Sequence, residues 1–502
     1  MNKFIQLITM SVATALIPCV SVASPTDPVV VITPPTEQGA PQVPGSRLLA
    51  DLPEAYTEEE FFISGTATLF NYAHNPPLGP TDITPVQEGV PYTTRIIVRR
   101  PEHANKFNGT VVIEWWNSTA GFDTAPVWDA SAEYYARNGI TYVGVTNSTT
   151  SLGFLVDGCS LFGVLPPACG TRYATLSLPE NGLAFEMVSQ IANLLKSDAL
   201  DNPIPSTYDV ERIFHAGESQ QGGSMITYAS AFHLPGVNDG YFVQAAATAR
   251  PINFGPACGA EGSPLYPSCT PRLVYPDSLV RTDLPVPVYQ GVTQLDIEIL
   301  FGTLGRQPDT PTFRYYEVAG GGHVTAHKDI TLIPAGLLGP DPVFLEDLCQ
   351  NPMNTTADGP VFASYVWNAL WERMYDQSAT GAIPPPGQMM DVVANVVQKD
   401  AYGNGLGGVR LPSMDVPTAT YISGNQADPF LPPFLINIGN LACFLSGSVF
   451  PFDQMTLDTL YRNDGQYTSK VMAAVKALKS QGLLLQRDAV KIKGVAAAGI
   501  PD

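Results

Sequence analysis

The stretch that decides the fold is Arg212–Gly223, which reads RIFHAGESQQGG. Its first residues are apolar, β-branched or aromatic and favour a buried strand, whereas the apolar pattern of 224–232 favours a helix. Gly217, Glu218 and Ser219 lie at the turn between the two. A sharp turn from strand to helix can present a serine at the carboxyl end of a strand. Ser219 is therefore predicted to be a nucleophile.

Such a turn needs small residues two positions before and two positions after the serine, because strand and helix approach closely there. Gly217 meets the first requirement. Gln221 stands at the second position, and the small residues come one later, at Gly222 and Gly223. The pattern is Gly-x-Ser-x-Gln, and the alternative interpretation is an ordinary serine that caps a helix. Gly-x-Ser alone is common in proteins, so the prediction that Ser219 is a nucleophile rests on the strand before it and the helix after it.

Alternating strands and helices surround this turn. Strands are predicted at 110–116, 140–145, 210–216, 241–246, 286–290 and 313–318, and helices at 125–138, 181–197 and 224–232. This order predicts a mostly parallel sheet with helices on both faces. Two earlier strands, 61–70 and 92–99, suit an antiparallel start. Insertions at about 147–180 and 250–284 are expected over the carboxyl edge of the sheet, where α/β proteins bind ligands.

The N-terminus has the pattern of an export signal. Lys3 precedes an apolar run, 4–20, and Ser21-Val22-Ala23 supplies small residues for cleavage before Ser24. We expect a signal peptide at 1–23, an extended Pro-rich arm at 24–60, and a secreted or periplasmic protein. A membrane anchor is the alternative, and no other stretch is long and apolar enough to span a bilayer.

Export makes disulfides the expected state of the remaining cysteines. Proximity in the sequence favours Cys159–Cys169 and Cys258–Cys269, which leaves Cys349–Cys443. Each short bridge would contribute roughly 2–3 kcal/mol by restricting the unfolded loop. We predict no metal site, since neither a Cys-x-x-Cys pair nor a histidine cluster is present.

Composition narrows the classes of partner. The 502 residues are 45% apolar, enough for a large core, and carry a net charge of −20. An acidic surface repels phosphate backbones, so nucleic acid is excluded as a partner.

A nucleophilic serine needs a histidine base. His233, His323 and His327 follow Ser219 in the sequence. His233 comes too soon, in the helix behind the turn. His323 follows strand 313–318 and three glycines, which places it on a loop at the carboxyl end of a strand. We predict His323 as the base, with His327 as the rival.

The base needs a carboxylate to orient it. Asp296 follows the predicted strand 286–290 and is the predicted acid. Glu298 is the rival on the same loop, and Asp283 fits less well because it precedes the strand.

Two backbone N–H groups must bind the negative charge that develops on the substrate carbonyl, and losing one typically costs about 3–4 kcal/mol in the barrier. The N–H of Gln220, directly after the serine, is one predicted donor. The loop after strand 110–116 should supply the other, and Ser118 is the predicted residue. Asn117 and Thr119 flank it as possible substrate contacts.

At these residues the sequence resembles a family of exported α/β-hydrolase-domain proteins, serine hydrolases with a Gly-Glu-Ser-Gln elbow. The matching segments are Glu114–Asn117, Gly217–Gln220, Asp296 and Gly320–His323, and a C-terminal segment, Asp400–Pro412, is also similar. The resemblance runs from about residue 60 to the end. It implies the α/β-hydrolase fold for 61–380, a Ser-Asp-His triad, and a C-terminal extension, 381–502, packed on the same domain.

The resemblance and the residues together predict a carboxylic-ester hydrolase that needs no cofactor. Its substrate would be a small-molecule or polymeric ester, and no stable membrane insertion is expected after signal cleavage. An acyl transferase, an amidase or a polyester depolymerase could use the same triad. The irregular Gln221 also leaves a non-catalytic binding protein of this fold as an alternative.

Overall fold

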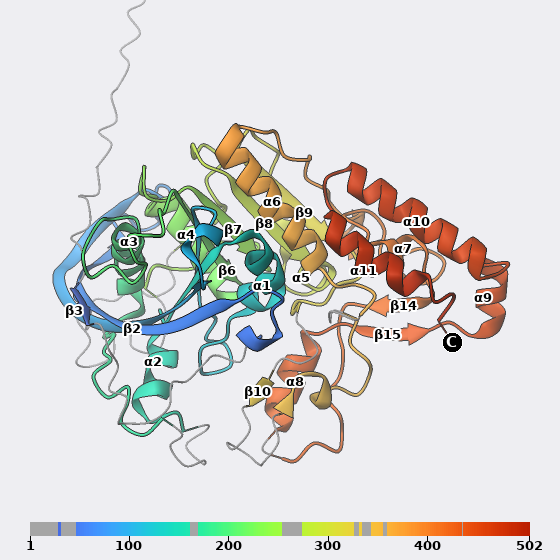
Figure 1. Cartoon of the computed structure of the whole chain (residues 1–502), viewed down its shortest axis with the longest axis horizontal. Helices are drawn as coiled ribbons and strands as arrows, with labels where there is room; N and C mark the ends of the chain where they lie inside the picture. The colour runs from blue at the N-terminus through green and yellow to red at the C-terminus, as the bar shows by residue number, and fades with distance from the viewer. Residues whose placement is uncertain are drawn as a thin grey trace, which may run out of the picture.

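A nine-stranded sheet forms the centre of the molecule (Figure 1). The computed structural model describes residues 29–31, 47–160, 169–253, 274–325, 331–333, 343–354, 359–433 and 435–501. In spatial order the strands are β1 (Val29–Val31), β2 (Tyr56–Tyr72), β3 (Ile83–Pro101), β5 (Thr141–Val145), β4 (Thr110–Trp115), β6 (Arg212–Glu218), β7 (Gly240–Gln244), β8 (Val288–Thr293) and β9 (Phe313–Val318). Pairing is antiparallel from β1 to β5 and parallel from β5 to β9. The predicted mostly parallel sheet with antiparallel N-terminal strands is confirmed.

Helices cover both faces of the sheet. On one face, Trp371 of α6 (Ser364–Thr380) packs against Phe242 of β7 at 5.0 Å between ring centroids, and α1 (Pro126–Asn138) lies beside α6. On the other face, Trp115 of β4 packs against Phe185 of α3 (Ala184–Leu195) at 5.4 Å and against Tyr228 of α4 (Gln220–Ala231) at 5.2 Å. Strands β4 to β9 are almost wholly buried, as a sheet covered on both faces requires.

The N-terminal hairpin is longer than predicted. Strand β2 begins at Tyr56, inside the segment expected to be an arm, and pairs with β3 as far as Pro101. Strand β3 supplies arginines that pair with Glu58 and Glu60 of this stretch. Arg99 Nε lies 2.7 Å from Glu58 Oε2, and Arg95 Nη1 lies 3.0 Å from Glu60 Oε1. The predicted signal peptide and most of the predicted arm lie outside the described residues.

The C-terminal part contains many short elements. They are β12 (Val392–Val393), β13 (Val396–Val397), α7 (Pro412–Asp415), β14 (Ala419–Ile422), α8 (Ile436–Phe444), β15 (Ser448–Pro451), α9 (Gln454–Leu460), α10 (Asp464–Ser480) and α11 (Gln486–Ala496). Figure 1 shows α10 and α11 beyond the β9 side of the sheet. Elements this short have too few residues to show a period in sequence.

Two of the three predicted disulfides are present. Cys159 and Cys169 have their Cα atoms 5.5 Å apart, and Cys349 and Cys443 have theirs 5.3 Å apart. Cys258 and Cys269 lie outside the described residues. In the part of the chain that the structure describes, no helix combines the length and hydropathy needed to cross a bilayer.

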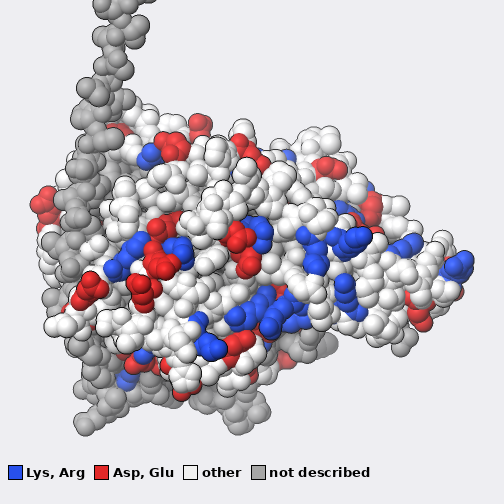
Figure 2. All heavy atoms as spheres, turned by 45° about the horizontal axis from the view of Figure 1, so that its top comes forward, with Lys and Arg blue, Asp and Glu red and all other residues white. Residues whose placement is uncertain are grey.

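Charged side chains are sparse on the surface. They make up 14% of the residues, and Figure 2 shows them separated by wide uncharged areas. On the face shown in that view, Lys and Arg gather from the lower centre toward the right, although the chain is acidic as a whole.

Candidate active site

Ser219 sits at the sharp turn between β6 and α4. Its backbone has φ 54° and ψ −115°, a conformation that L-residues avoid and that costs of order 1–3 kcal/mol. The turn is held by its own backbone, since the Ser219 N–H donates to Gln244 O at 2.9 Å and the Gly223 N–H donates to Ser219 O at 3.0 Å. The half-buried serine is thus presented at the carboxyl edge of the sheet.

The glycines of the turn show where strand and helix meet. A Cβ on Gly217 would lie closer than 3.0 Å to the Gln221 carbonyl, so Gly217 is required as the sequence suggested. A Cβ on Gly222 would lie 2.5 Å from Gln244 O. The second close approach is therefore at Gly222, where α4 meets the end of β7. The expectation that residue 221 needs to be small is wrong for this chain.

Asp296 and His323 meet directly. Asp296 lies in the short helix α5 (Gln294–Glu298) after β8, where its Oδ2 accepts hydrogen bonds from Thr293 N at 2.7 Å and Thr293 Oγ1 at 3.1 Å. Its Oδ1 lies 2.5 Å from His323 Nδ1. Asp296 and His323 are 1% and 4% exposed, so this carboxylate–imidazole pair is shielded from water.

The loop of His323 is fixed by segments distant in the sequence. Gly320 N donates to Gln294 Oε1 at 2.8 Å, and Val324 N donates to Leu445 O at 2.9 Å. A Cβ on Gly322 would lie closer than 3.0 Å to Gly447 N. The run of glycines thus lets the C-terminal part pack against the histidine loop, a role that its sequence did not reveal.

The second imidazole nitrogen faces a carboxylate for which the sequence predicted no role. His323 Nε2 lies 3.3 Å from Glu218 Oε1. Glu218 Oε2 accepts a hydrogen bond from Asn117 Nδ2 at 3.0 Å, and Ser219 Oγ has no hydrogen-bond partner among the described residues. The available signal for Glu218 was a carboxylate that ends an apolar strand beside the candidate nucleophile.

The loop residue Ser118 contacts the side chain of Gln220. Both Ser118 N and Ser118 Oγ donate to the side-chain oxygen of Gln220, at 3.3 and 2.8 Å. The N–H of Gln220 has no hydrogen-bond partner among the described residues. Thr119 N donates to Asn117 Oδ1 at 2.8 Å, which shapes the loop. In this structure the Ser118 N–H is therefore already hydrogen-bonded to the Gln220 side chain.

The rival residues lie in other surroundings. His233 Nδ1 lies 2.9 Å from Tyr241 OH, behind the sheet edge. Glu298 is 3.5 Å from Lys399 Nζ, and Asp283 pairs with Arg281 at 2.9 Å. His327 lies outside the described residues.

Burial and neighbouring charges together shift the pKa values of ionisable side chains at this site. Burial raises the pKa of Glu218 to about 7, although the nearby His323 opposes this effect. Burial lowers the pKa of His323, but Asp296 and Glu218 outweigh it and raise the value to about 9. Burial also raises the pKa of Glu114, below the Asn117 loop, to about 8. His323 and Glu218 therefore form a charged pair mainly between the pKa of Glu218, about 7, and the pKa of His323, about 9.

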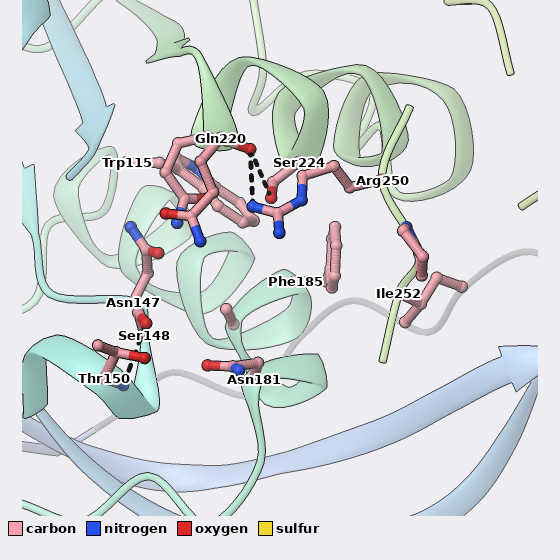
Figure 3. A pocket seen from close by; sticks show the side chains of 13 residues that line it. Trp115, Asn147, Ser148, Thr150, Asn181, Phe185, Gln220, Ser224, Arg250 and Ile252 are labelled. Carbon is pink, nitrogen blue, oxygen red and sulfur yellow. Dashed lines mark hydrogen bonds between the residues drawn. The ribbon is translucent and has the colours of Figure 1, made fainter. Parts of the chain in front are cut away.

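A pocket of about 50 Å³ opens beside the start of α4 (Figure 3). Arg250 Nη1 donates to Gln220 O at 3.3 Å in its wall. Most of the lining consists of neutral hydrogen-bonding side chains together with two large aromatic rings: Asn147, Ser148, Thr150, Asn181, Gln220, Gln221, Ser224, Trp115 and Phe185. Within the described ranges, no group of His, Cys, Asp and Glu is arranged to hold a metal ion.

A family model described as alpha/beta hydrolase domain matches residues 31–494. No curated protein sequence matches the chain.

Solved structures similar to the chain include three esterases or related hydrolases. Esterase Est22 has 13% identity and a TM-score of 0.27, and the match covers 52% of this chain and 71% of that one. Dienelactone hydrolase from Anabaena variabilis has 12% identity and a TM-score of 0.27, with 46% and 82% covered. A glucuronoyl esterase from Teredinibacter turnerae has 14% identity and a TM-score of 0.25, with 57% and 77% covered.

Proposed function

Because the chain belongs to the alpha/beta hydrolase domain family, we propose that it is a serine hydrolase that cleaves carboxylic esters. The observation that carries the proposal is the buried Asp296–His323 pair, 2.5 Å between Oδ1 and Nδ1, at the sheet edge where Ser219 is held at φ 54°. A strained serine, an oriented imidazole and a buried carboxylate are the parts that acyl transfer requires.

In the proposed reaction, Ser219 Oγ attacks the ester carbonyl and gives its proton to His323 Nε2. The carbonyl electrons move onto oxygen, and the resulting oxyanion binds the N–H of Gln220. His323 then passes the proton to the departing alcohol as the C–O bond breaks, leaving an acyl-serine. Water repeats the sequence and releases the acid. Asp296 holds the imidazole with Nδ1 protonated and stabilises its charged form.

The loop after β4 is proposed to complete the oxyanion site. Ser118 N–H lies next to the start of α4 but bonds to the Gln220 side chain. Rotation of that side chain, triggered by an entering carbonyl, would free the donor without moving the backbone. Asn117 and Thr119 shape the same loop and would line the entry to it.

Export to the cell exterior or periplasm is part of the proposal. It is supported by the signal pattern at 1–23 and by the disulfides Cys159–Cys169 and Cys349–Cys443, which oxidising compartments favour. Mass spectrometry of the mature protein should find Ser24 at its N-terminus. Retention of Met1 on exported protein would contradict signal cleavage.

Covalent labelling tests the nucleophile. A fluorophosphonate probe should attach to Ser219, and Ser219→Ala should lose labelling and short-ester turnover together. Ser469→Ala, an exposed serine of α10, is the matched control and should keep both. A folded wild-type protein that neither labels nor turns over esters would instead be a non-catalytic member of the fold.

A further inference from the structure

Glu218 is a carboxylate of the site that the proposed reaction does not use. It is the last residue of β6, is 7% exposed, and its two carboxyl oxygens have different partners. Oε2 accepts from Asn117 Nδ2 at 3.0 Å, and Oε1 lies 3.3 Å from His323 Nε2. It therefore connects the oxyanion loop to the imidazole nitrogen that must receive the serine proton.

The two carboxylates bracket the imidazole from opposite nitrogens. Asp296 contacts Nδ1, and Glu218 contacts Nε2. An imidazole between two anions is stabilised in its doubly protonated form. In that form Nε2 has a proton to donate and no lone pair with which to accept one, so His323 cannot act as a base.

Other charges around the pair are few in the described part of the chain. The small cavity beside His323 and Glu218 is lined from α1, β7 and α6 by uncharged residues, Pro126, Ala130, Gln244, Ala245 and Trp367. Glu114 of β4 is also near Glu218, but its pKa of about 8 leaves it largely protonated at neutral pH, and Tyr315 of β9, near Asp296, stays uncharged there because burial raises its pKa. No described cation other than His323 balances the carboxylate of Glu218.

We propose that Glu218 is a positioning residue that holds His323 as an imidazolium in the free enzyme, so that the base becomes available only as the Nε2 proton leaves at alkaline pH. Ser219 Oγ has no hydrogen-bond partner among the described residues, which agrees with this resting arrangement, because Nε2 of its expected partner lies 3.3 Å from Glu218 Oε1. The expected pH dependence of ester turnover rests on the proposed esterase function, whereas the expected protonation of His323 does not depend on it.

The pH profile of kcat/KM for an uncharged short ester is the first test. For wild type we expect an acid limb with its midpoint near pH 9, the pKa of His323. Glu218→Gln removes one anion but keeps an oxygen that can accept from Asn117. Its limb should move down by roughly 1–3 pH units, the usual effect of one close opposite charge. The kcat/KM at pH 7 should then rise by about tenfold or more. Below the midpoint, each pH unit by which the limb moves down raises kcat/KM about tenfold.

Two variants separate positioning from a purely structural role. Glu298→Gln removes a half-buried carboxylate from α5, the helix that also carries Asp296, but this carboxylate does not contact His323. The acid limb of this variant's pH profile should therefore stay in place. Glu218→Asp keeps the charge on a shorter side chain and should restore part of the alkaline midpoint. A folded Glu218→Gln protein with an unmoved limb would overturn the inference, whatever its absolute rate.

Proton NMR of the full-length Ser219→Ala protein keeps the inference testable without activity. The His323 ring should titrate well above the ordinary histidine value of about 6.5 and should titrate lower when Glu218→Gln is added. Titration at or below about 6.5 with Glu218 present would refute it. Missing fluorophosphonate labelling together with an elevated His323 titration would refute the proposed function alone.

Discussion

Gly322, next to the candidate base, packs against the backbone of Gly447, so closely that a Cβ on Gly322 would come within 3.0 Å of Gly447 N. This contact joins the loop after β9 to the segment between α8 and β15. Val324 N adds a hydrogen bond of 2.9 Å to Leu445 O in the same place. The C-terminal part of the chain therefore fixes the position of His323.

Gly322→Ala should disturb that position. The added methyl group would collide with backbone rather than with a flexible side chain, so the loop must shift. Displacements of about 1 Å at catalytic groups can cost on the order of 100-fold in rate, and we expect a loss of roughly 10- to 100-fold in kcat/KM. Gly494→Ala, in the open surface of α11, is the control, since a Cβ there meets nothing within 4 Å. Equal activities of the two variants would contradict the contact.

At the strand-to-helix turn of Ser219, residue 222 must be glycine because the backbone approaches closely there, whereas its neighbour, residue 221, need not be small. Gly222→Ala would place its Cβ 2.5 Å from Gln244 O and should destabilise the protein by roughly 1–3 kcal/mol, the usual range for overpacking. Gln221→Gly restores the common Gly-x-Ser-x-Gly pattern, but it should lower stability by up to about 1 kcal/mol, because glycine is a poor helix former. Thermal unfolding of both variants measures the difference. A stabilising Gln221→Gly would show that the close approach is at 221.

Asp296→Asn tests the carboxylate that orients the imidazole. Thr293 N–H donates to Asp296 Oδ2, so the asparagine oxygen would turn to Thr293 and its NH₂ group to His323 Nδ1. That arrangement leaves the proton on Nε2, where it blocks transfer from the serine. We expect kcat to fall by roughly 10³- to 10⁴-fold, as for the wrong tautomer in other triads. Asp283→Asn, exposed beside Arg281, should change kcat little; a comparable loss there would argue against a specific role of Asp296.

The disulfide Cys349–Cys443 lies close to the segment that supports His323. It closes a loop with a sequence separation of 94, and its removal in Cys349→Ser/Cys443→Ser should cost roughly 4–5 kcal/mol by the chain-entropy estimate. Removing Cys159–Cys169, with a separation of 10, should cost roughly 2–3 kcal/mol. Denaturant unfolding of the two double variants gives the comparison. The reverse order would mean that native contacts, and not loop closure, dominate.

The two carboxylates of the site show what local sequence can reveal. Asp296 was predictable, because it follows a buried strand and chain order places the acid between Ser219 and His323. Its distance to His323 was not, since that depends on how α5 packs against the loop of His323. The sequence predicted no role for Glu218, although this residue directly precedes Ser219. Its role depends on where the loop of His323 lies, and nothing within β6 records that.

The sequence by itself determined the alternation of strands and helices, the turn at Ser219, the order of serine, acid and histidine, and two cysteine pairings. These follow from periodicity and from short-range spacing, which are properties of neighbouring residues. Only the tertiary structure decided that Gly222 takes the close approach, that the C-terminal segment at Gly447 holds the loop of His323, and that Glu218 faces Nε2. Each of these is a contact between segments far apart in the chain, and its energy depends on packing distances that no local pattern encodes.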